Sequence, residues 1–189
     1  MKKKAIFLDR DGTINVEKNY LHKIEDFQYE DKVPEALKIL KNLGYILIVV
    51  TNQAGIGRGY YTEKDLEKLN NFLIKDSQKF GGNIEKIYYC PHHPTHGVGN
   101  YKENCSCRKP ENGMIEEGIK NFHIDREKSF IVGDKFSDLM AGIKSGISPI
   151  LVRTGYGQRT EEELCGNPYK THIKIYDSLF DFAQNLKNK

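Results

Sequence analysis

Residues 5–15, which read AIFLDRDGTIN, decide the fold of this chain. The four apolar residues 5–8 predict a short buried strand, and Asp9 and Asp11 follow it with one residue between them. At the carboxyl end of a central strand of an open α/β sheet, side chains point into the crevice where such sheets bind ligands. Two carboxylates held there repel each other unless a cation or a shared proton intervenes, and Mg2+ suits their oxygen atoms.

This acidic pair is suited to phosphoryl transfer. An Asp carboxylate can attack phosphorus to form an aspartyl-phosphate, while a second carboxylic acid protonates the leaving oxygen and later activates water. We assign the nucleophile to Asp9 and the acid/base role to Asp11. The alternative is structural, because Asp-x-Asp-Gly also occurs in turns and in calcium-binding loops.

The length, charge and apolar content of the chain limit the class of protein to which it can belong. A length of 189 residues with 38% hydrophobic residues suits one domain over residues 1–189. The formal charge of +3 is too balanced for a nucleic-acid coat, so no nucleic-acid partner is expected. The first apolar run is too short for a signal peptide, and no stretch reaches transmembrane length. We expect a cytoplasmic protein with no membrane partner, and a monomer by default.

Apolar runs and amphipathic segments alternate beyond the first strand. Such alternation predicts a Rossmann-like α/β fold, with a mostly parallel sheet between helices on both faces. Further strands are predicted at 45–50, 84–89, 129–132 and 149–153, and helices at 34–43, 62–80, 114–122, from 137 or 138, and from 177 or 178.

The second predicted strand ends in polar residues. Thr51 and Asn52, with backbone N–H groups around Gly55, could hold phosphoryl oxygens. The nearby glycines do not have the G-x-G-x-x-G spacing of a dinucleotide site. We interpret them as a flexible turn with Arg58 facing solvent.

The fourth predicted strand also ends in an acidic residue. Asp134 can complete a Mg2+ site, Lys135 can contact a substrate, and Asp138 can orient the metal ligands. The alternative for Asp138 is a helix cap. The loop after the first strand is a solvated connection or a substrate contact, and its candidate residues are Glu17, Lys18, Asn19 and Tyr20.

The segment 90–107 has almost no apolar residues, so burial cannot order it. Its Cys-x-His and Cys-x-Cys pairs form a Cys3His set suited to a structural tetrahedral Zn2+ site. The ligands are Cys90, His92, Cys105 and Cys107, with His93 or His96 as substitutes for His92. Free thiols are the alternative, and Cys165 has no partner by spacing.

A basic pair follows the last cysteine of this segment. Arg108 can fork onto phosphate or hydroxyl oxygens, and Lys109 can act as a point charge beside a phosphoryl group in transfer. A zinc site that holds Cys107 would also hold the start of this pair. The alternative is an ordinary exposed basic pair.

In this order, strand-DxDGT, strand-TN, a later Lys and strand-GDxxxD resemble the signature motifs of the haloacid dehalogenase superfamily of phosphotransferases. The stretches FLDRDGTIN, VVTNQAGIGRG, YYCPHHP, CSCRKP and IVGDK resemble its subfamily of heptose bisphosphate and histidinol phosphate phosphatases. The resemblance implies a Mg2+-dependent phosphatase for a small sugar phosphate, with a zinc loop in place of a large cap domain. It favours the C7 phosphate of a heptose bisphosphate, on the route to nucleotide-activated heptose.

The same resemblance implies a role for each matching position. Asp9 is nucleophile and Mg2+ ligand, Asp11 is acid/base and binds Mg2+ through its backbone carbonyl, and Asp134 is the later Mg2+ ligand. Thr51 binds phosphate and Lys109 neutralises its charge. The implied substrate contacts are Glu17, Lys18, Asn19, Tyr20, Thr51, Asn52, Gln53, Ala54, Arg108, Lys109 and Lys135, and the implied zinc ligands are Cys90, His92, Cys105 and Cys107. Ala54 departs from the pattern, since serine is frequent there, which puts a hydroxyl contact at this position in doubt.

Three other functions compete with this hypothesis. Histidinol phosphate is a rival substrate within the same chemistry. A polynucleotide 3′-phosphatase is disfavoured by the lack of a basic surplus. A non-catalytic, zinc-stabilised module that binds sugar phosphates is disfavoured by the intact pair of Asp9 and Asp11.

Overall fold

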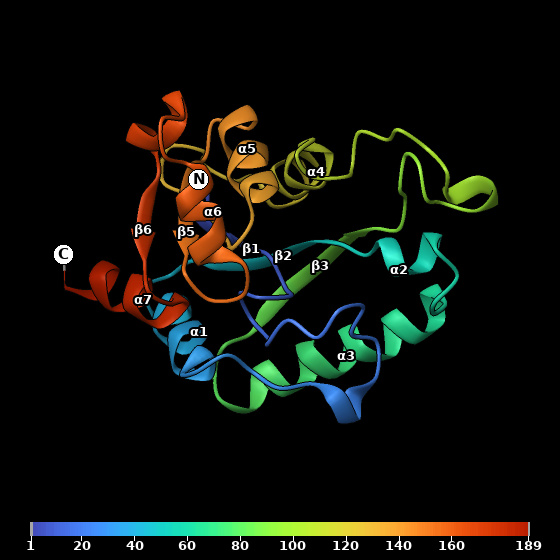
Figure 1. Cartoon of the computed structure of the whole chain (residues 1–189). Coiled ribbons are helices and arrows are strands. Elements are labelled where there is room, and N and C mark those ends of the chain that lie inside the picture. Colours follow the sequence, from blue (N-terminus) through green and yellow to red (C-terminus); the bar gives the residue numbers. More distant parts are fainter. Residues whose placement is uncertain (1, 189) are drawn as a thin grey trace.

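The computed structural model describes residues 2–188. Its centre is a six-stranded sheet in the order β3-β2-β1-β4-β5-β6, in which all neighbouring strands are parallel (Figure 1). The strand order changes direction between β1 and β4, which is the switch point where open α/β sheets bind ligands. The strands are β1 (Ala5–Leu8), β2 (Ile46–Asn52), β3 (Ile84–Cys90), β4 (Phe130–Gly133), β5 (Ser148–Val152) and β6 (Lys174–Tyr176).

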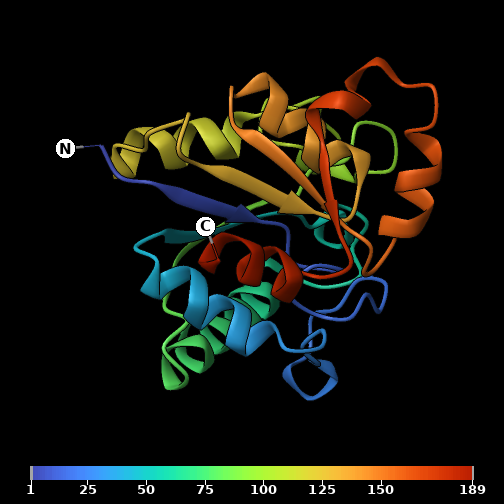
Figure 2. The same cartoon turned by 90° about the vertical axis from the view of Figure 1, so that its left-hand side faces the viewer.

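Helices cover both faces of the sheet, as expected (Figure 2). Alternate residues of β1 face opposite layers, so Ile6 and Leu8 pack into one core and Ala5 and Phe7 into the other. The first core receives α1 (Val33–Asn42), α3 (Glu63–Lys79) and α7 (Leu179–Lys187), and the second receives α4 (Gly113–Phe122) and α5 (Phe136–Lys144). Because β1 is buried on both faces, its carboxyl end is held rigidly.

Five predicted strands and five predicted helices are present, with shifts of a few residues at their ends. The sequence did not indicate β6 or the helices α2 (Ala54–Gly57) and α6 (Gly157–Glu163). Two of these elements are only three or four residues long, and α6 reads GQRTEEE without an apolar stripe. A tertiary contact holds α6, since Thr160 Oγ1 donates to the Asp134 carbonyl oxygen at 2.7 Å.

The start of α5 differs from the expected cap at residue 137 or 138. The N-cap is Lys135, and the carboxylate of Asp138 accepts a hydrogen bond from the Lys135 backbone N–H at 2.9 Å. Asp138 therefore lies one turn inside the helix, with its other carboxylate oxygen directed toward the sheet's carboxyl edge.

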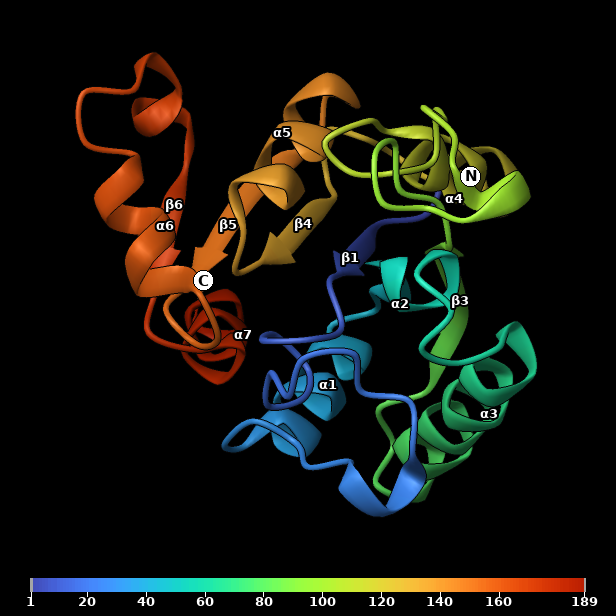
Figure 3. The same cartoon turned by 45° about the vertical axis from the view of Figure 1, so that its right-hand side comes forward.

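The segment between β3 and α4 is a long connection outside the sheet, and it lies beside α2 (Figure 3). The two are joined by a hydrogen bond of 2.8 Å from the Val98 N–H to the Gly57 carbonyl oxygen. No large cap domain interrupts residues 2–188. In the same residues, no helix is long and apolar enough to cross a membrane.

Candidate active site

A buried ion-pair cluster occupies the carboxyl ends of β1 and β2. The Asp9 N–H donates to the Val132 carbonyl oxygen at 2.9 Å, which holds the start of the loop against β4. Lys109 Nζ lies 2.8 Å from Asp9 Oδ1 and 2.7 Å from Asp138 Oδ1. It also donates to the Val50 carbonyl oxygen at 2.6 Å. Lys109, which follows the segment 90–107, thus reaches the carboxyl end of β1.

Burial and charge compete in setting the ionisation of this cluster. Burial raises the pKa of Asp9, but the charges of Lys109 and Lys135 outweigh it and leave the pKa below its ordinary value. Burial lowers the pKa of Lys109, and the charges of Asp138 and Asp9 more than reverse this. Asp9 is therefore a carboxylate and Lys109 an ammonium at neutral pH, as the proposed nucleophile and charge-neutralising residue require.

The acidic groups around Asp9 form a candidate metal site. Carboxylate oxygens of Asp9, Asp134 and Asp138 lie within 4.8 Å of one another. Burial and the charge of Asp9 raise the pKa of Asp134 to about 8. Asp134 Oδ1 is buried and accepts no hydrogen bond from residues 2–188. A hard divalent cation would relieve this repulsion and bind the free oxygen, so the donor set fits Mg2+.

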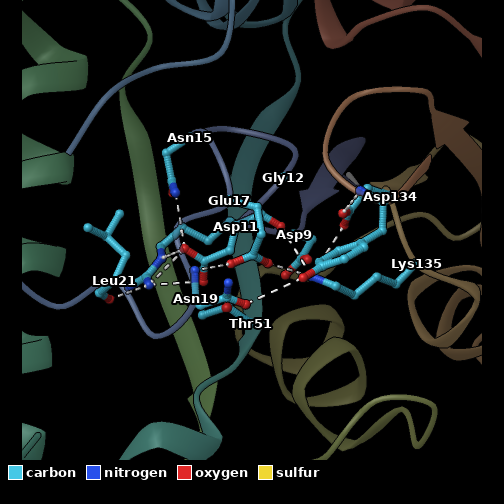
Figure 4. A network of polar contacts seen from close by, with 12 residues as sticks. Asp9, Asp11, Gly12, Asn15, Glu17, Asn19, Leu21, Thr51, Asp134 and Lys135 are labelled. Atoms are coloured by element: carbon cyan, nitrogen blue, oxygen red, sulfur yellow. Dashed lines mark hydrogen bonds and ion pairs between the residues drawn. The ribbon is translucent and has the colours of Figure 1, made fainter. Parts of the chain in front are cut away.

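The Lys135 ammonium group lies between two of the expected Mg2+ ligands, the Asp134 carboxylate and the Asp11 carbonyl (Figure 4). Its Nζ lies 3.7 Å from Asp134 Oδ1, 3.5 Å from the Asp11 carbonyl oxygen and 3.1 Å from Glu17 Oε2. The Asp11 carbonyl and the Asp134 carboxylate therefore face one point, as the backbone-carbonyl ligand hypothesis requires.

Gly12 allows this close approach. Its φ is +86°, and a Cβ atom there would lie 2.3 Å from Asp134 Oδ2. Any larger residue would be strained in the left-handed region and would also displace Asp134. The DG step after the strand is thus required by the packing of the two acidic loops.

The Asp11 carboxylate is turned toward a different set of partners. It accepts hydrogen bonds from Arg10 Nη2 at 2.9 Å, Asn15 Nδ2 at 3.0 Å and Gln53 Nε2 at 2.8 Å. Arg10 is fully buried, and its Nη2 also donates to the Leu21 carbonyl oxygen at 2.9 Å. These donors hold Asp11 at the edge of the cavity that Asp9 also lines.

Gln53 owes its orientation to Tyr61, a residue that the sequence did not single out. The Tyr61 hydroxyl donates to Gln53 Oε1 at 2.5 Å, which leaves Gln53 Nε2 to donate to Asp11 and to Thr51 Oγ1 at 2.9 Å. Only one orientation of the amide satisfies all of these contacts. Tyr61 is therefore a positioning residue for the proposed acid/base.

Tyr61→Phe is expected to lower kcat about 3- to 10-fold while KM stays within about twofold, because one hydrogen bond that orients Gln53 is lost. Steady-state phosphate release checks this. Tyr60→Phe, at a neighbouring residue whose side chain is 56% exposed, is the matched control. A change in KM alone would contradict a role in positioning Asp11.

A cavity of about 580 Å³ opens above these residues. This is within the range of about 300–1,000 Å³ for small-molecule sites, so it holds more than a phosphoryl group. Every expected substrate contact except Lys18 lines it: Glu17, Asn19, Tyr20, Thr51, Asn52, Gln53, Ala54, Arg108, Lys109 and Lys135. It is also lined by Arg58, Tyr61, His93, Pro110, Ser137 and Tyr156.

Two expectations about individual side chains are corrected here. Lys18 is exposed, does not line the cavity, and donates to the Asp26 carbonyl oxygen at 2.8 Å. The chain turns sharply after it, because Asn19 and Tyr20 have φ of 49° and 61°. Arg58 was expected to face solvent, but it lines the cavity and its Nε is buried.

The expected zinc ligands converge. The Sγ atom of Cys105 lies 3.4 Å from that of Cys90 and 3.2 Å from that of Cys107, and His92 Nδ1 lies 3.5 Å from Cys107 Sγ. A tetrahedral Zn2+ with bonds of about 2.3 Å to sulfur spaces its ligand atoms roughly 3.5–3.8 Å apart, so the set fits. His92 is the histidine that lies in this cluster with the three cysteines, and His93 and His96 are outside it.

Four features define the class of haloacid dehalogenase-like phosphotransferases. They are the parallel sheet, the acidic pair Asp9 and Asp11 after β1, the buried Lys109 and the acidic Asp134 after β4. A family model described as HAD-hydrolase-like matches residues 106–182. The D-glycero-beta-D-manno-heptose-1,7-bisphosphate 7-phosphatase of Haemophilus ducreyi is 46% identical over 165 residues, 86% of this chain and 90% of the relative. The D-glycero-alpha-D-manno-heptose-1,7-bisphosphate 7-phosphatase of Photorhabdus laumondii is 46% identical over 179 residues, 93% and 98% of the two chains.

A solved structure agrees with these relatives. D,D-heptose 1,7-bisphosphate phosphatase from B. bronchiseptica, complexed with magnesium and phosphate, has a TM-score of 0.86 and 27% identity, and the match covers 98% of both chains. The chain belongs to the haloacid dehalogenase-like hydrolases, in the family of these heptose bisphosphate phosphatases. The resemblance noted from the sequence motifs is thereby confirmed.

Proposed function

We propose that the protein is a Mg2+-dependent phosphatase that removes the C7 phosphate of D-glycero-D-manno-heptose 1,7-bisphosphate. The observation that carries the proposal is the convergence of Asp9, Asp11 and Lys109 at one cavity, although Lys109 is far from the acidic pair in the sequence. A carboxylate oxygen of the buried Asp134 lies within 4.8 Å of one of Asp9. The relatives named for this reaction support the substrate, and their names include both anomers. The proposal therefore covers the bisphosphate of either anomer.

The chain's own residues supply the chemical steps. Asp9 attacks phosphorus in line, so that a bond from its oxygen to phosphorus forms as the bond from phosphorus to the C7 oxygen breaks. Asp11 gives its proton to the departing oxygen, then takes a proton from the water that hydrolyses the aspartyl-phosphate. Lys109 and Thr51 stabilise the charge of the phosphoryl oxygens. Mg2+ held by Asp9, Asp134 and the Asp11 carbonyl would add positive charge there.

Zn2+ has a structural role in the proposal. Four protein ligands leave no open position for substrate, as is typical of structural zinc. Asn52 connects the loop to the site, because its side chain accepts from the Lys109 N–H at 3.1 Å and donates to the Lys109 carbonyl oxygen at 2.9 Å. Ordering Cys107 thus helps to hold Arg108 and Lys109 at the cavity.

Cys107→Ser is expected to raise KM about 10-fold or more and to lower kcat less, since a loosened loop weakens substrate binding first. Steady-state kinetics with zinc content measured by atomic absorption checks this. Cys165→Ser is the matched control, because Cys165 is exposed and outside the cluster. An unchanged KM in zinc-free Cys107→Ser protein would contradict the role of zinc.

Phosphate release tests the function directly. The protein is incubated with heptose 1,7-bisphosphate, histidinol phosphate or a 3′-phosphorylated oligonucleotide, each with Mg2+ or with EDTA. We expect fast, Mg2+-dependent release from the heptose ester alone. Faster release from histidinol phosphate would transfer the assignment to that substrate, equal rates on all esters would defeat the substrate choice, and no release from any would favour a binding module.

We also propose that the protein works as a cytoplasmic, single-domain monomer. One sheet runs through residues 2–188, and none of the four cysteines forms a disulfide there, as suits a reducing compartment. Light scattering during size-exclusion chromatography tests the monomer.

A further inference from the structure

We propose that Arg58, Arg108 and His93 form a second anion-binding subsite in the catalytic cavity, which holds the phosphate group that is not hydrolysed. This inference rests on the proposed function and adds to it the basis of selectivity for a bisphosphate over a monophosphate. Arg58 and His93 were not among the expected substrate contacts.

The first argument is the charge balance of the cavity wall. Each carboxylate that lines it has a cationic partner: Lys109 for Asp9 and Asp138, Arg10 for Asp11, and Lys135 for Glu17. Arg58 and Arg108 line the same wall, and no carboxylate of residues 2–188 forms an ion pair with either. The cavity therefore carries two positive charges without a protein counter-charge.

The arginines elsewhere in the chain behave differently. The sequence has six arginines. Apart from Arg58 and Arg108, each of them forms an ion pair with a carboxylate. These are Arg10 with Asp11, Arg126 with Glu116, Arg153 with Glu161 and Arg159 with Glu163. Unpaired arginines thus occur in one place in the described chain, which points to an anionic ligand there.

Arg58 also has an unsatisfied donor. Its Nε is buried and has no acceptor among residues 2–188, while its guanidinium carbon lies 5.9 Å from the centre of the Tyr20 ring. A buried donor without an acceptor is costly, and a guanidinium next to an aromatic face is restricted in its orientation. A dianionic phosphate in the cavity would pair with the guanidinium charge of Arg58, which lines the cavity.

Arg108 and His93 provide the other donors. Arg108 Nη1 donates to the His92 carbonyl oxygen at 3.0 Å, which anchors one arm of the guanidinium and leaves the other nitrogens for a ligand. His93 Nδ1 accepts from the backbone N–H groups of Thr95 at 3.3 Å and His96 at 3.1 Å, so its proton is on Nε2. Arg108 and His93 both line the same cavity as Arg58.

The two arginines come from different segments that are fitted together. Arg58 ends α2, and Arg108 follows the zinc loop. At the junction, a Cβ atom on Gly57 would lie 2.7 Å from the Pro91 carbonyl oxygen, so only glycine permits this packing. The Val98 N–H also donates to the Gly57 carbonyl oxygen at 2.8 Å. The spacing of Arg58 and Arg108 is therefore preorganised by the folded loop.

The test compares heptose 1,7-bisphosphate with heptose 7-phosphate, which share the reacting phosphate and differ only in the second one. Arg58→Gln is expected to raise KM for the bisphosphate about 10- to 100-fold with a smaller effect on kcat, as for loss of a charged hydrogen bond. Its KM for the 7-phosphate is expected to change less than about threefold. Arg58→Lys, which keeps the charge, is expected to recover part of the loss.

Arg159→Gln is the matched control, because its side chain is 76% exposed and pairs with Glu163 outside the catalytic cavity. It should move neither KM. Thermal unfolding of each variant checks that the fold is retained.

Two failures are distinguishable. If the wild type hydrolyses the bisphosphate and Arg58→Gln affects both esters equally or neither, the subsite is wrong and the proposed function stands. If the wild type hydrolyses only p-nitrophenyl phosphate, the proposed function is wrong, and both heptose esters are then measured as competitive inhibitors. In that case, the subsite proposal is wrong if Arg58→Gln leaves the inhibition constant of the bisphosphate unchanged. An increase of about 10-fold or more in the inhibition constant of the bisphosphate alone, on the order expected for a charged hydrogen bond, would support the subsite.

Discussion

Asp9→Asn is expected to lose about 10,000-fold or more of the wild-type turnover, because the amide cannot act as the nucleophile toward phosphorus. The substitution is nearly isosteric, and Lys109 keeps its ion pair of 2.7 Å with Asp138. The fold should therefore be retained. Phosphate release under saturating substrate measures the loss, and circular dichroism with thermal unfolding measures the fold.

Asp31→Asn is the matched control for this variant. The Asp31 side chain is 88% exposed, so the same change of charge there should leave turnover unaltered. Trapping an acid-stable phosphorylated protein from the wild type, and none from Asp9→Asn, would add direct support for the covalent intermediate. Substantial activity in Asp9→Asn protein would remove the covalent mechanism.

Lys109→Met is expected to abolish activity and to lower the free energy of unfolding by about 3–5 kcal/mol, because it leaves two buried carboxylates without their cation. Lys109 and both of its acidic partners are less than 5% exposed, so water cannot compensate. Urea unfolding in EDTA measures the loss without stabilisation by added Mg2+.

The pH dependence of this loss follows from the acidic partners. Burial raises the pKa of Asp138 above its ordinary value, with the charge of Lys109 opposing it. Without Lys109, the folded protein would bind a proton that the unfolded chain does not hold, so stability falls as pH rises. The destabilisation should be smaller at about pH 6 than at about pH 8.

A second variant separates stability from catalysis. Lys109→Met combined with Asp138→Asn removes one of the two unpaired charges and should recover about 1 kcal/mol or more, with no recovery of activity. Wild-type stability in Lys109→Met protein, or a loss that does not vary with pH, would contradict the ion-pair cluster.

The strands and the longer helices could be predicted because their signals are local. The apolar run before Asp9 and the capping residue Thr62 of α3 each depend on neighbours within one strand or one turn. By contrast, β6 and α6 have short or polar sequences, and packing against the rest of the chain stabilises them. The periodicity of a short segment does not predict contacts with residues that are distant in the sequence.

The candidate site divides in the same way. Asp9, Asp11 and Asp134 could be found because carboxyl ends of parallel strands meet at one edge of a sheet. The four members of the Cys3His set could be found from their spacing and chemistry. The partners of those residues could not, because the buried Arg10 reads as an ordinary charged residue and Tyr61 as an ordinary aromatic one.

Residue type and spacing along the chain were thus sufficient for the fold class, the acidic centre and the Cys3His set. Contacts between distant segments established which way the loop side chains point: Lys18 away from the cavity, Arg58 into it, and Lys109 between Asp9 and Asp138. The physical reason is that a side chain's direction in a loop is set by packing and hydrogen bonds to residues far away in sequence. Those interactions exist once the sheet, α2 and residues 90–109 have come together.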